Sequence, residues 1–145
     1  METTESSLVQ RLLEDIKSAS RQVYFGTDGA FTCFSDGRFL ERADSLPQAI
    51  DQLRYPFPNT LSTDAIRKML PQDIIKSGEI LGSIEETGKQ NKLLCKKYTC
   101  VVDSLYYDYL KIRYPDARIY CLGRNKPVVF LQGDIVRAVL MPIKT

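Results

Sequence analysis

The 145-residue sequence contains no histidine, and this absence removes several common kinds of functional site. Without an imidazole, the chain cannot build a Ser-His-Asp or Cys-His nucleophilic system or a metal site that includes histidine. Four cysteines are present, and only Cys95 and Cys100 are close in sequence. A four-cysteine zinc site needs two close pairs. We therefore expect no metal and no cofactor, and we interpret the cysteines in apolar stretches, Cys33, Cys100 and Cys121, as buried free thiols.

Long apolar runs and a strong charge of one sign are also lacking. No stretch approaches the roughly 20 apolar residues that a membrane-spanning helix needs. The first residues, METTESSLVQ, lack the basic and apolar regions of a signal peptide, so we expect a cytoplasmic protein that makes no membrane contact. The net charge of +2 predicts no attraction of the whole molecule to nucleic acid.

What is present is the composition of a folded domain. Hydrophobic residues make up 43% of the chain and charged residues 26%. The length fits one domain over residues 1–145, with residues 1–5 expected to fray.

The first half of the sequence predicts a helix followed by a strand meander. Leu8, Leu12 and Ile16 recur at helical spacing after Ser6 or Ser7, either of which could cap the helix. Two glycine-containing turns, at 26–29 and 35–37, then separate short apolar runs. The elements expected in this half are a helix over 6–20, strands over 23–25, 30–34 and 38–40, a helix over 45–53, a connector over 55–59 and a helix over 62–70.

The second half repeats this order of a helix followed by a meander. The elements expected there are a strand over 79–84, a turn over 85–89, a strand over 92–102, a helix over 105–113, and strands over 118–122, 128–131 and 135–140. The pattern predicts an α+β fold, with short helices packed on one face of a mainly antiparallel sheet.

Several candidate sites have an ordinary structural interpretation. Asp28 and Asp36 stand in glycine-flanked turns, where aspartate bonds the local backbone, and we therefore predict no enzyme. Part of the tyrosine set of residues 105–114 lies on a core-facing helical stripe. Tyr107 and Tyr114 lie on a different side, and they are either core or ordinary surface residues or contacts with a partner.

One basic stretch stands out, and two interpretations of it remain open. It comprises Lys89, Lys92, Lys96 and Lys97, and the alternation of a strand would place Lys92 and Lys96 on one face. That face could contact nucleic acid phosphates. Alternatively, it is a solvated strand that lysine protects against edge pairing.

Two segments resemble the bacterial DNA polymerase sliding clamp. FSDGRFL at residues 34–40 is similar to the clamp's Ala-Thr-Asp-Gly-His-Arg-Leu, with Arg38-Phe39 in place of His-Arg. VLMPIKT at residues 139–145 is similar to the clamp's closing Val-Val-Met-Pro-Met-Arg-Leu, and the chain stops at the matching place. The helix expected to begin near Asp103 and the strands after it follow in the clamp's order.

The resemblance implies a clamp-like domain with a protein-binding pocket. In clamps these two segments line an apolar pocket that accepts peptide motifs of polymerases and repair proteins. The residues that would line it here are Gly37, Arg38, Leu40, Val139, Met141, Pro142 and Ile143. A bacterial clamp subunit has three such domains, so a ring would require a homo-oligomer. The chain looks closest to single-domain clamp-like proteins of phages and mobile elements.

The leading hypothesis is thus a non-enzymatic module that binds a peptide or a replication or repair protein. A second hypothesis is an inhibitor, carried by a phage or mobile element, that occludes the surface of a host nucleic-acid enzyme such as a defence nuclease. A third is a nucleic-acid-binding accessory that uses the stretch from Lys89 to Lys97.

Overall fold

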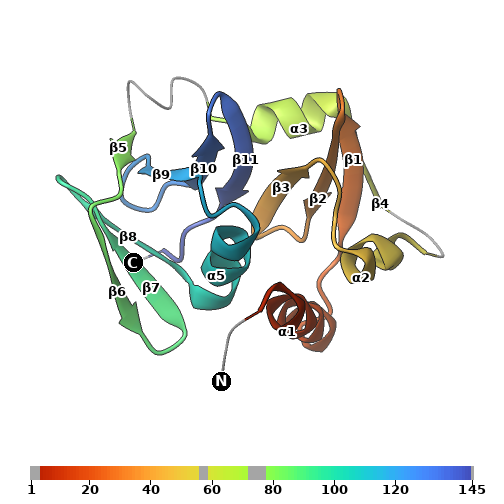
Figure 1. Cartoon of the computed structure of the whole chain (residues 1–145), viewed down its shortest axis with the longest axis horizontal. Coiled ribbons are helices and arrows are strands. Elements are labelled where there is room, and N and C mark those ends of the chain that lie inside the picture. Colours follow the sequence, from red (N-terminus) through yellow and green to blue (C-terminus); the bar gives the residue numbers. More distant parts are fainter. Residues whose placement is uncertain (1–3, 56–58, 72–77, 145) are drawn as a thin grey trace.

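The computed structural model describes residues 4–55, 59–71 and 78–144, and it shows an α+β fold (Figure 1). The elements of the first half are α1 (Glu5–Ser18), β1 (Tyr24–Asp28), β2 (Phe31–Ser35), β3 (Phe39–Ala43), α2 (Gln48–Asp51) with the 3-10 turn η1 (Gln52–Arg54), β4 (Asn59–Leu61) and α3 (Thr63–Met69). Those of the second half are β5 (Glu79–Ile80), β6 (Ser83–Thr87), β7 (Gln90–Leu94), β8 (Thr99–Asp103), α5 (Ser104–Arg113), β9 (Arg118–Cys121), β10 (Val128–Gln132) and β11 (Ile135–Leu140).

The larger sheet has eight strands in the order β4-β1-β2-β3-β11-β10-β9-β5. Its neighbouring strands pair antiparallel, except that β4 runs parallel to β1. At its centre β3 pairs with β11, and Leu40 stands opposite Val139 in that register. The two halves of the chain therefore meet along a shared line in the middle of the sheet.

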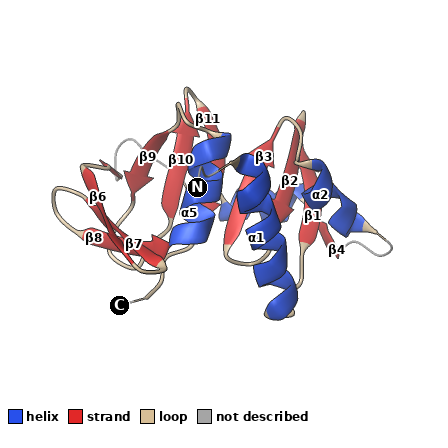
Figure 2. Cartoon of the chain, turned by 60° about the horizontal axis from the view of Figure 1, so that its bottom comes forward, coloured by secondary structure: helices blue, strands red, loops and turns tan. Residues whose placement is uncertain are grey.

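The helix-plus-meander order predicted for each half is confirmed. The order α1-β1-β2-β3 recurs as α5-β9-β10-β11, and the third strands of the two meanders are the pair that joins them. Helices α1 and α5 pack against each other on one face of the sheet (Figure 2). The topology is that of two similar units joined edge to edge, although no repeat is visible at the level of residue identity.

The main core lies between this helical layer and the sheet. Leu8, Leu12 and Ile16 of α1 pack there with aromatic side chains of both meanders. Helix α3, however, lies on the opposite face, where Ile66 packs against Leu40 and Cys33. The prediction that all helices share one face is therefore correct for α1, α2 and α5 and wrong for α3.

The segment from residue 79 to 103 differs most from the prediction. The strand expected over 79–84 is two short strands in different sheets, β5 and β6. The turn expected over 85–89 is largely strand, since β6 continues to Thr87 and the chain reverses at Gly88, whose φ is +64°. The strand expected over 92–102 is the hairpin β7–β8, which with β6 forms a separate antiparallel sheet.

The helix ends and one strand also differ. Thr4 caps α1 and Glu5 opens it, so the expected cap at Ser6 or Ser7 and the fraying of residue 5 are wrong. Strand β4 was not predicted, since Asn59 fell within the expected connector. Residues 56–58 of that connector lie outside the described residues. Ser62 caps α3, where the sequence allowed Ser62 or Thr63, and Asp103 caps α5, where it allowed Asp103 or Ser104.

Candidate functional site

The turn after β2 and the segment after β11 together form a pocket of about 400 Å³. The backbone N–H of Met141 donates to the carbonyl of Arg38 at 2.9 Å, and the N–H of Ile143 donates to the carbonyl of Val101 at 2.8 Å. These two bonds fix the segment 141–144 between the β2–β3 turn and β8. The residues that line this pocket, called here the Met141 pocket, are Gly37, Arg38, Asp103, Tyr106, Met141, Pro142 and Ile143.

Five of the seven residues expected at this pocket line it, and two do not. Leu40 and Val139 are only 1% and 3% exposed. They lie opposite each other in the β3–β11 pair. Successive strand residues face opposite sides of the sheet, so Leu40 faces away from the side on which its neighbour Phe39 packs. Leu40 consequently packs against Ile66 on the α3 side, away from the pocket. Both residues are structural, and their place as lining residues is a prediction that the geometry corrects.

Asp103 and Tyr106 also line the pocket, although neither was among the residues expected there from the sequence. Asp103 Oδ1 accepts a hydrogen bond from the N–H of Leu105 at 2.9 Å, which caps α5. Its Oδ2 lies 3.9 Å from Arg38 Nη1, and the Arg38 guanidinium stands 5.9 Å from the centre of the Tyr106 ring. Both residues fall in the helical segment that resembles the clamp, and this was the signal that could have placed them here.

Met141 is the most exposed apolar side chain of the pocket, at 45%. Arg38 is similarly open, with 52% of its side chain exposed, while Pro142 and Ile143 are half-buried. A flexible thioether beside a rigid proline ring gives an apolar slot that can adapt to an incoming side chain. Arg38 adds a positive charge at its rim.

A buried polar network holds the β2–β3 turn in place beneath the pocket. The Tyr106 hydroxyl donates to Asp36 Oδ2 at 2.8 Å, and Arg21 Nε donates to the same oxygen at 3.2 Å. Asp36 Oδ1 accepts from the N–H of Arg38 at 2.9 Å, and Arg21 also contacts Asp15. Burial, with the nearby Asp36 charge, raises the pKa of Tyr106 above its ordinary value, so this hydroxyl stays a donor.

A second carboxylate, Glu41 on β3, organises the far end of α5. Tyr109 donates to its Oε1 at 2.6 Å, and Tyr114 and Arg113 donate to its Oε2 at 2.5 and 3.0 Å. Burial, followed by the Glu41 charge, raises the pKa values of Tyr109 and Tyr114.

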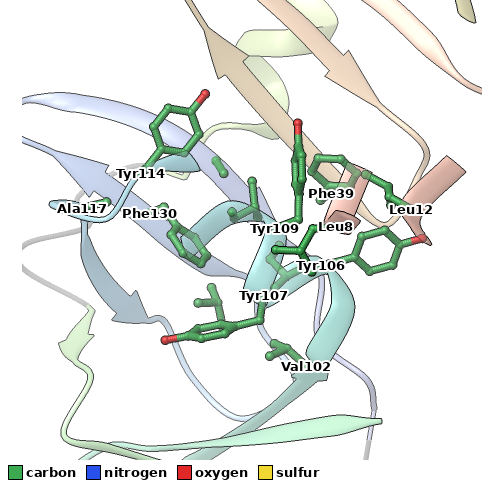
Figure 3. Close-up of a cluster of buried hydrophobic side chains, with 14 of the residues drawn as sticks. Leu8, Leu12, Phe39, Val102, Tyr106, Tyr107, Tyr109, Tyr114, Ala117 and Phe130 are labelled. Carbon is green, nitrogen blue, oxygen red and sulfur yellow. The ribbon is translucent and has the colours of Figure 1, made fainter. Parts of the chain in front are cut away.

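Figure 3 shows the tyrosine side chains of α5 spreading toward different neighbours in the core. Tyr107, whose ring centre lies 5.8 Å from that of Phe130, is 3% exposed, and Tyr114 is 7% exposed. Both are therefore core residues, and the alternative interpretation of them as partner contacts is wrong.

The four lysines of the basic stretch do not share a strand face. Lys89 lies in the β6–β7 turn and Lys92 lies on β7, while Lys96 and Lys97 lie in the turn before β8. Lys92 and Lys97 nevertheless line one hollow, and Lys96 and Lys89 do not line it. The expected pairing of Lys92 with Lys96 fails because the chain reverses between them.

The cysteines and acidic residues of the described ranges form no arrangement suited to a metal. Cys33, Cys100 and Cys121 are buried free thiols, as predicted, and Cys95 is half-buried. Among the residues that the structure describes, no group of three or more cysteine, aspartate or glutamate side chains could hold a metal ion. In the same described ranges, no helix has both the length and the apolar character required to cross a bilayer.

The chain was compared with protein-family models, with curated proteins and with solved structures, and none of the three comparisons gave a match.

Proposed function

We propose that the chain is a non-enzymatic, clamp-like module whose Met141 pocket binds a peptide segment of a replication or repair protein. The observation that supports this is the meeting of residues 37–38 with residues 141–143 in one pocket. These residues come from the two segments that resemble the peptide-binding segments of sliding clamps. They lie far apart in the sequence, and two backbone hydrogen bonds hold the second segment in place.

The chemistry of the pocket suits a short peptide with an apolar anchor. Met141, Pro142 and Ile143 provide an apolar wall, and the fully buried Tyr106 lies behind it. Arg38 stands at the open side, where it could pair with a carboxylate of the peptide. The network of Asp36, Tyr106 and Arg21 keeps the wall rigid before binding, which reduces the entropy lost on association.

Methionine-methyl NMR tests this proposal directly. The chain has three methionines, and Met69 on α3 serves as an internal reference because it is also exposed, at 38%. A synthetic peptide carrying the clamp-binding motif of a polymerase would be titrated into protein labelled with ¹³C at the methionine methyl groups. We expect a saturable shift of the Met141 signal and none of the Met69 signal.

The matched variants are Met141→Asp and Met69→Asp, which place the same charge at exposed sites. Met141→Asp should weaken peptide binding by about tenfold or more, and Met69→Asp should leave it within about twofold. Leu40→Ala is unsuitable for this purpose, since Leu40 is buried and its truncation would act on the fold. Binding that persists in Met141→Asp, or no binding by the folded wild type, would overturn the proposal.

A further inference from the structure

The outer face of the small sheet β6–β7–β8 carries a second hollow, of about 550 Å³. Strand alternation sends Asn91 and Leu93 inward to the core, so Lys92 and Leu94 point outward. On β8 the same alternation places Cys100 and Val102 in the core and Thr99 on the outer face, and Val101, which is largely buried, lies at the base of the hollow. The residues that line this basic hollow are Glu85, Lys92, Leu94, Lys97, Tyr98, Thr99, Val101 and Arg124.

Three cations converge on this hollow from three parts of the chain. Lys92 stands on β7, Lys97 in the β7–β8 turn and Arg124 in the loop between β9 and β10. None of the three forms an ion pair within residues 4–55, 59–71 and 78–144. By contrast Arg21, Arg42, Arg113 and Arg137 each pair with a carboxylate. The hollow thus has unpaired positive charge around an apolar floor of Leu94 and Val101.

The acidic residues around the hollow favour an acidic polypeptide over a nucleic acid as its ligand. Glu85 lines the hollow, and the Glu79 carboxylate accepts from the N–H of Lys97 at 2.8 Å, so the basic surface is short and bounded by negative charge. A nucleic acid would need a longer series of phosphate contacts. The Tyr98 hydroxyl donates inward to the carbonyl of Cys121 at 2.7 Å, and Tyr98 is the one aromatic residue among the lining residues.

We propose that the basic hollow is a docking surface for an acidic segment of a partner polypeptide. Two or three carboxylates of that segment pair with Lys92, Lys97 and Arg124, and its apolar side chains lie on Leu94 and Val101. The hollow shares no lining residue with the Met141 pocket. The proposal therefore does not depend on the clamp-like function.

Fluorescence anisotropy with a labelled eight-residue peptide of alternating glutamate and leucine provides the test. The wild-type protein should bind this peptide saturably below about 1 mM, and rising salt should weaken the binding, because charged pairs at a surface are screened. A peptide in which glutamine replaces glutamate should bind at least about tenfold more weakly. A twelve-nucleotide thymidine strand serves as the nucleic-acid probe and should bind more weakly than the acidic peptide.

Two charge-reversal variants separate this site from general electrostatics. Lys97→Glu/Arg124→Glu acts on the hollow, whereas Lys96→Glu/Lys126→Glu makes the same change of net charge at exposed neighbours that do not line it. We expect at least about tenfold weaker binding in the first variant and less than about twofold change in the second. Met141→Asp should also have no effect.

Four outcomes would overturn the proposal. These are equal losses in the two charge-reversal variants, loss in Met141→Asp, absence of saturable binding by the folded wild type, and tighter binding of the thymidine strand than of the peptide.

Discussion

The Tyr106 hydroxyl donates a 2.8 Å hydrogen bond to Asp36, whereas the hydroxyl of the adjacent Tyr107 is buried with no partner in the described part of the chain. The hydroxyl of one tyrosine is thus hydrogen-bonded in the core, and the hydroxyl of its neighbour is not. One joins α5 to the turn that carries the Met141 pocket. The other contributes only its ring.

Removing each of these hydroxyls should have opposite consequences. Tyr106→Phe should reduce the free energy of unfolding by about 1–3 kcal/mol, because Asp36 loses a buried donor. Tyr107→Phe should leave it unchanged or raise it by up to about 1 kcal/mol, since it removes an unsatisfied polar atom. Urea unfolding followed by circular dichroism would measure both, and a greater loss in Tyr107→Phe would contradict the assignment.

Glu41→Gln should be among the most destabilising single changes in the chain. The Glu41 side chain is fully buried and accepts hydrogen bonds from Tyr109, Tyr114 and Arg113. Glutamine would leave the Arg113 charge without its buried partner, so we expect a loss of about 3–5 kcal/mol. The nearby Asp44→Asn, which changes an exposed carboxylate that pairs with the largely buried Arg137, is the control and should cost less than about 1 kcal/mol. Similar losses in both variants would show that burial does not set the energy of the Glu41 pair.

The buried tyrosines make the fold sensitive to alkaline conditions. Burial raises the pKa of Tyr107 to about 12, and it also raises those of Tyr106, Tyr109 and Tyr114 above the ordinary value of 10.0. Above pH 10 the unfolded chain loses these protons and the folded chain keeps them. Their contribution to stability is therefore complete below pH 10 and declines as pH rises, by about 1.4 kcal/mol per tyrosine and pH unit.

Thermal unfolding between pH 8 and pH 12, combined with tyrosinate absorbance, would check this expectation. The absorbance of the four buried tyrosines should rise with the unfolding transition. Ionisation of all eight tyrosines while circular dichroism remains native would contradict it.

Gly26→Ala should disrupt the pairing of β1 with β4. A Cβ at residue 26 would collide with the carbonyl of Leu61 and press against Ile66, whereas one at Gly29 would meet nothing. Gly29 has a φ of +61°, so Gly29→Ala should cost about 1 kcal/mol from backbone strain alone. We expect Gly26→Ala to cost more and to speed amide exchange in β4, measured by hydrogen exchange with mass spectrometry. Equal costs without faster exchange would count against this packing.

The cysteines should react with thiol reagents in an order set by burial. Burial raises the pKa of Cys33 to about 11, and Cys33 and Cys121 have no exposed surface. Cys95 is only half-buried, so iodoacetamide should label it first and label Cys33 only on unfolding. Peptide mapping after timed labelling would measure the order, and early modification of Cys33 would contradict the structure.

Local patterns predicted the helices and both meanders, because glycine turns and helical spacing are signals carried by neighbouring residues. The local patterns failed over residues 92–102, where they predicted one continuous strand. The β7–β8 turn from Cys95 to Tyr98 contains no glycine or proline that would have indicated a reversal of the chain. They also could not show that α3 covers the second face, since an apolar stripe identifies a buried side but not the surface that it meets.

The site was predictable to a different degree. The nearness of Arg38 and Met141 followed from the resemblance to clamps and not from spacing, because contacts between distant segments depend on the completed sheet. Arg38 lies in the β2–β3 turn beside the pocket, whereas Leu40 lies within β3 and packs against Ile66 on the α3 side, which a heptapeptide match does not reveal. Arg124 was missed at the basic hollow because it lies far in sequence from Lys92 and Lys97.

The pairing of β3 with β11 has a consequence for how the protein forms during translation. Strand β3 is made early, but its central partner leaves the ribosome only after residue 140 has been added. The nascent first meander therefore carries an open, apolar strand edge until β11 has been made. Completion of the sheet requires a long-range contact, which favours slow folding and gives chaperones a period in which to bind.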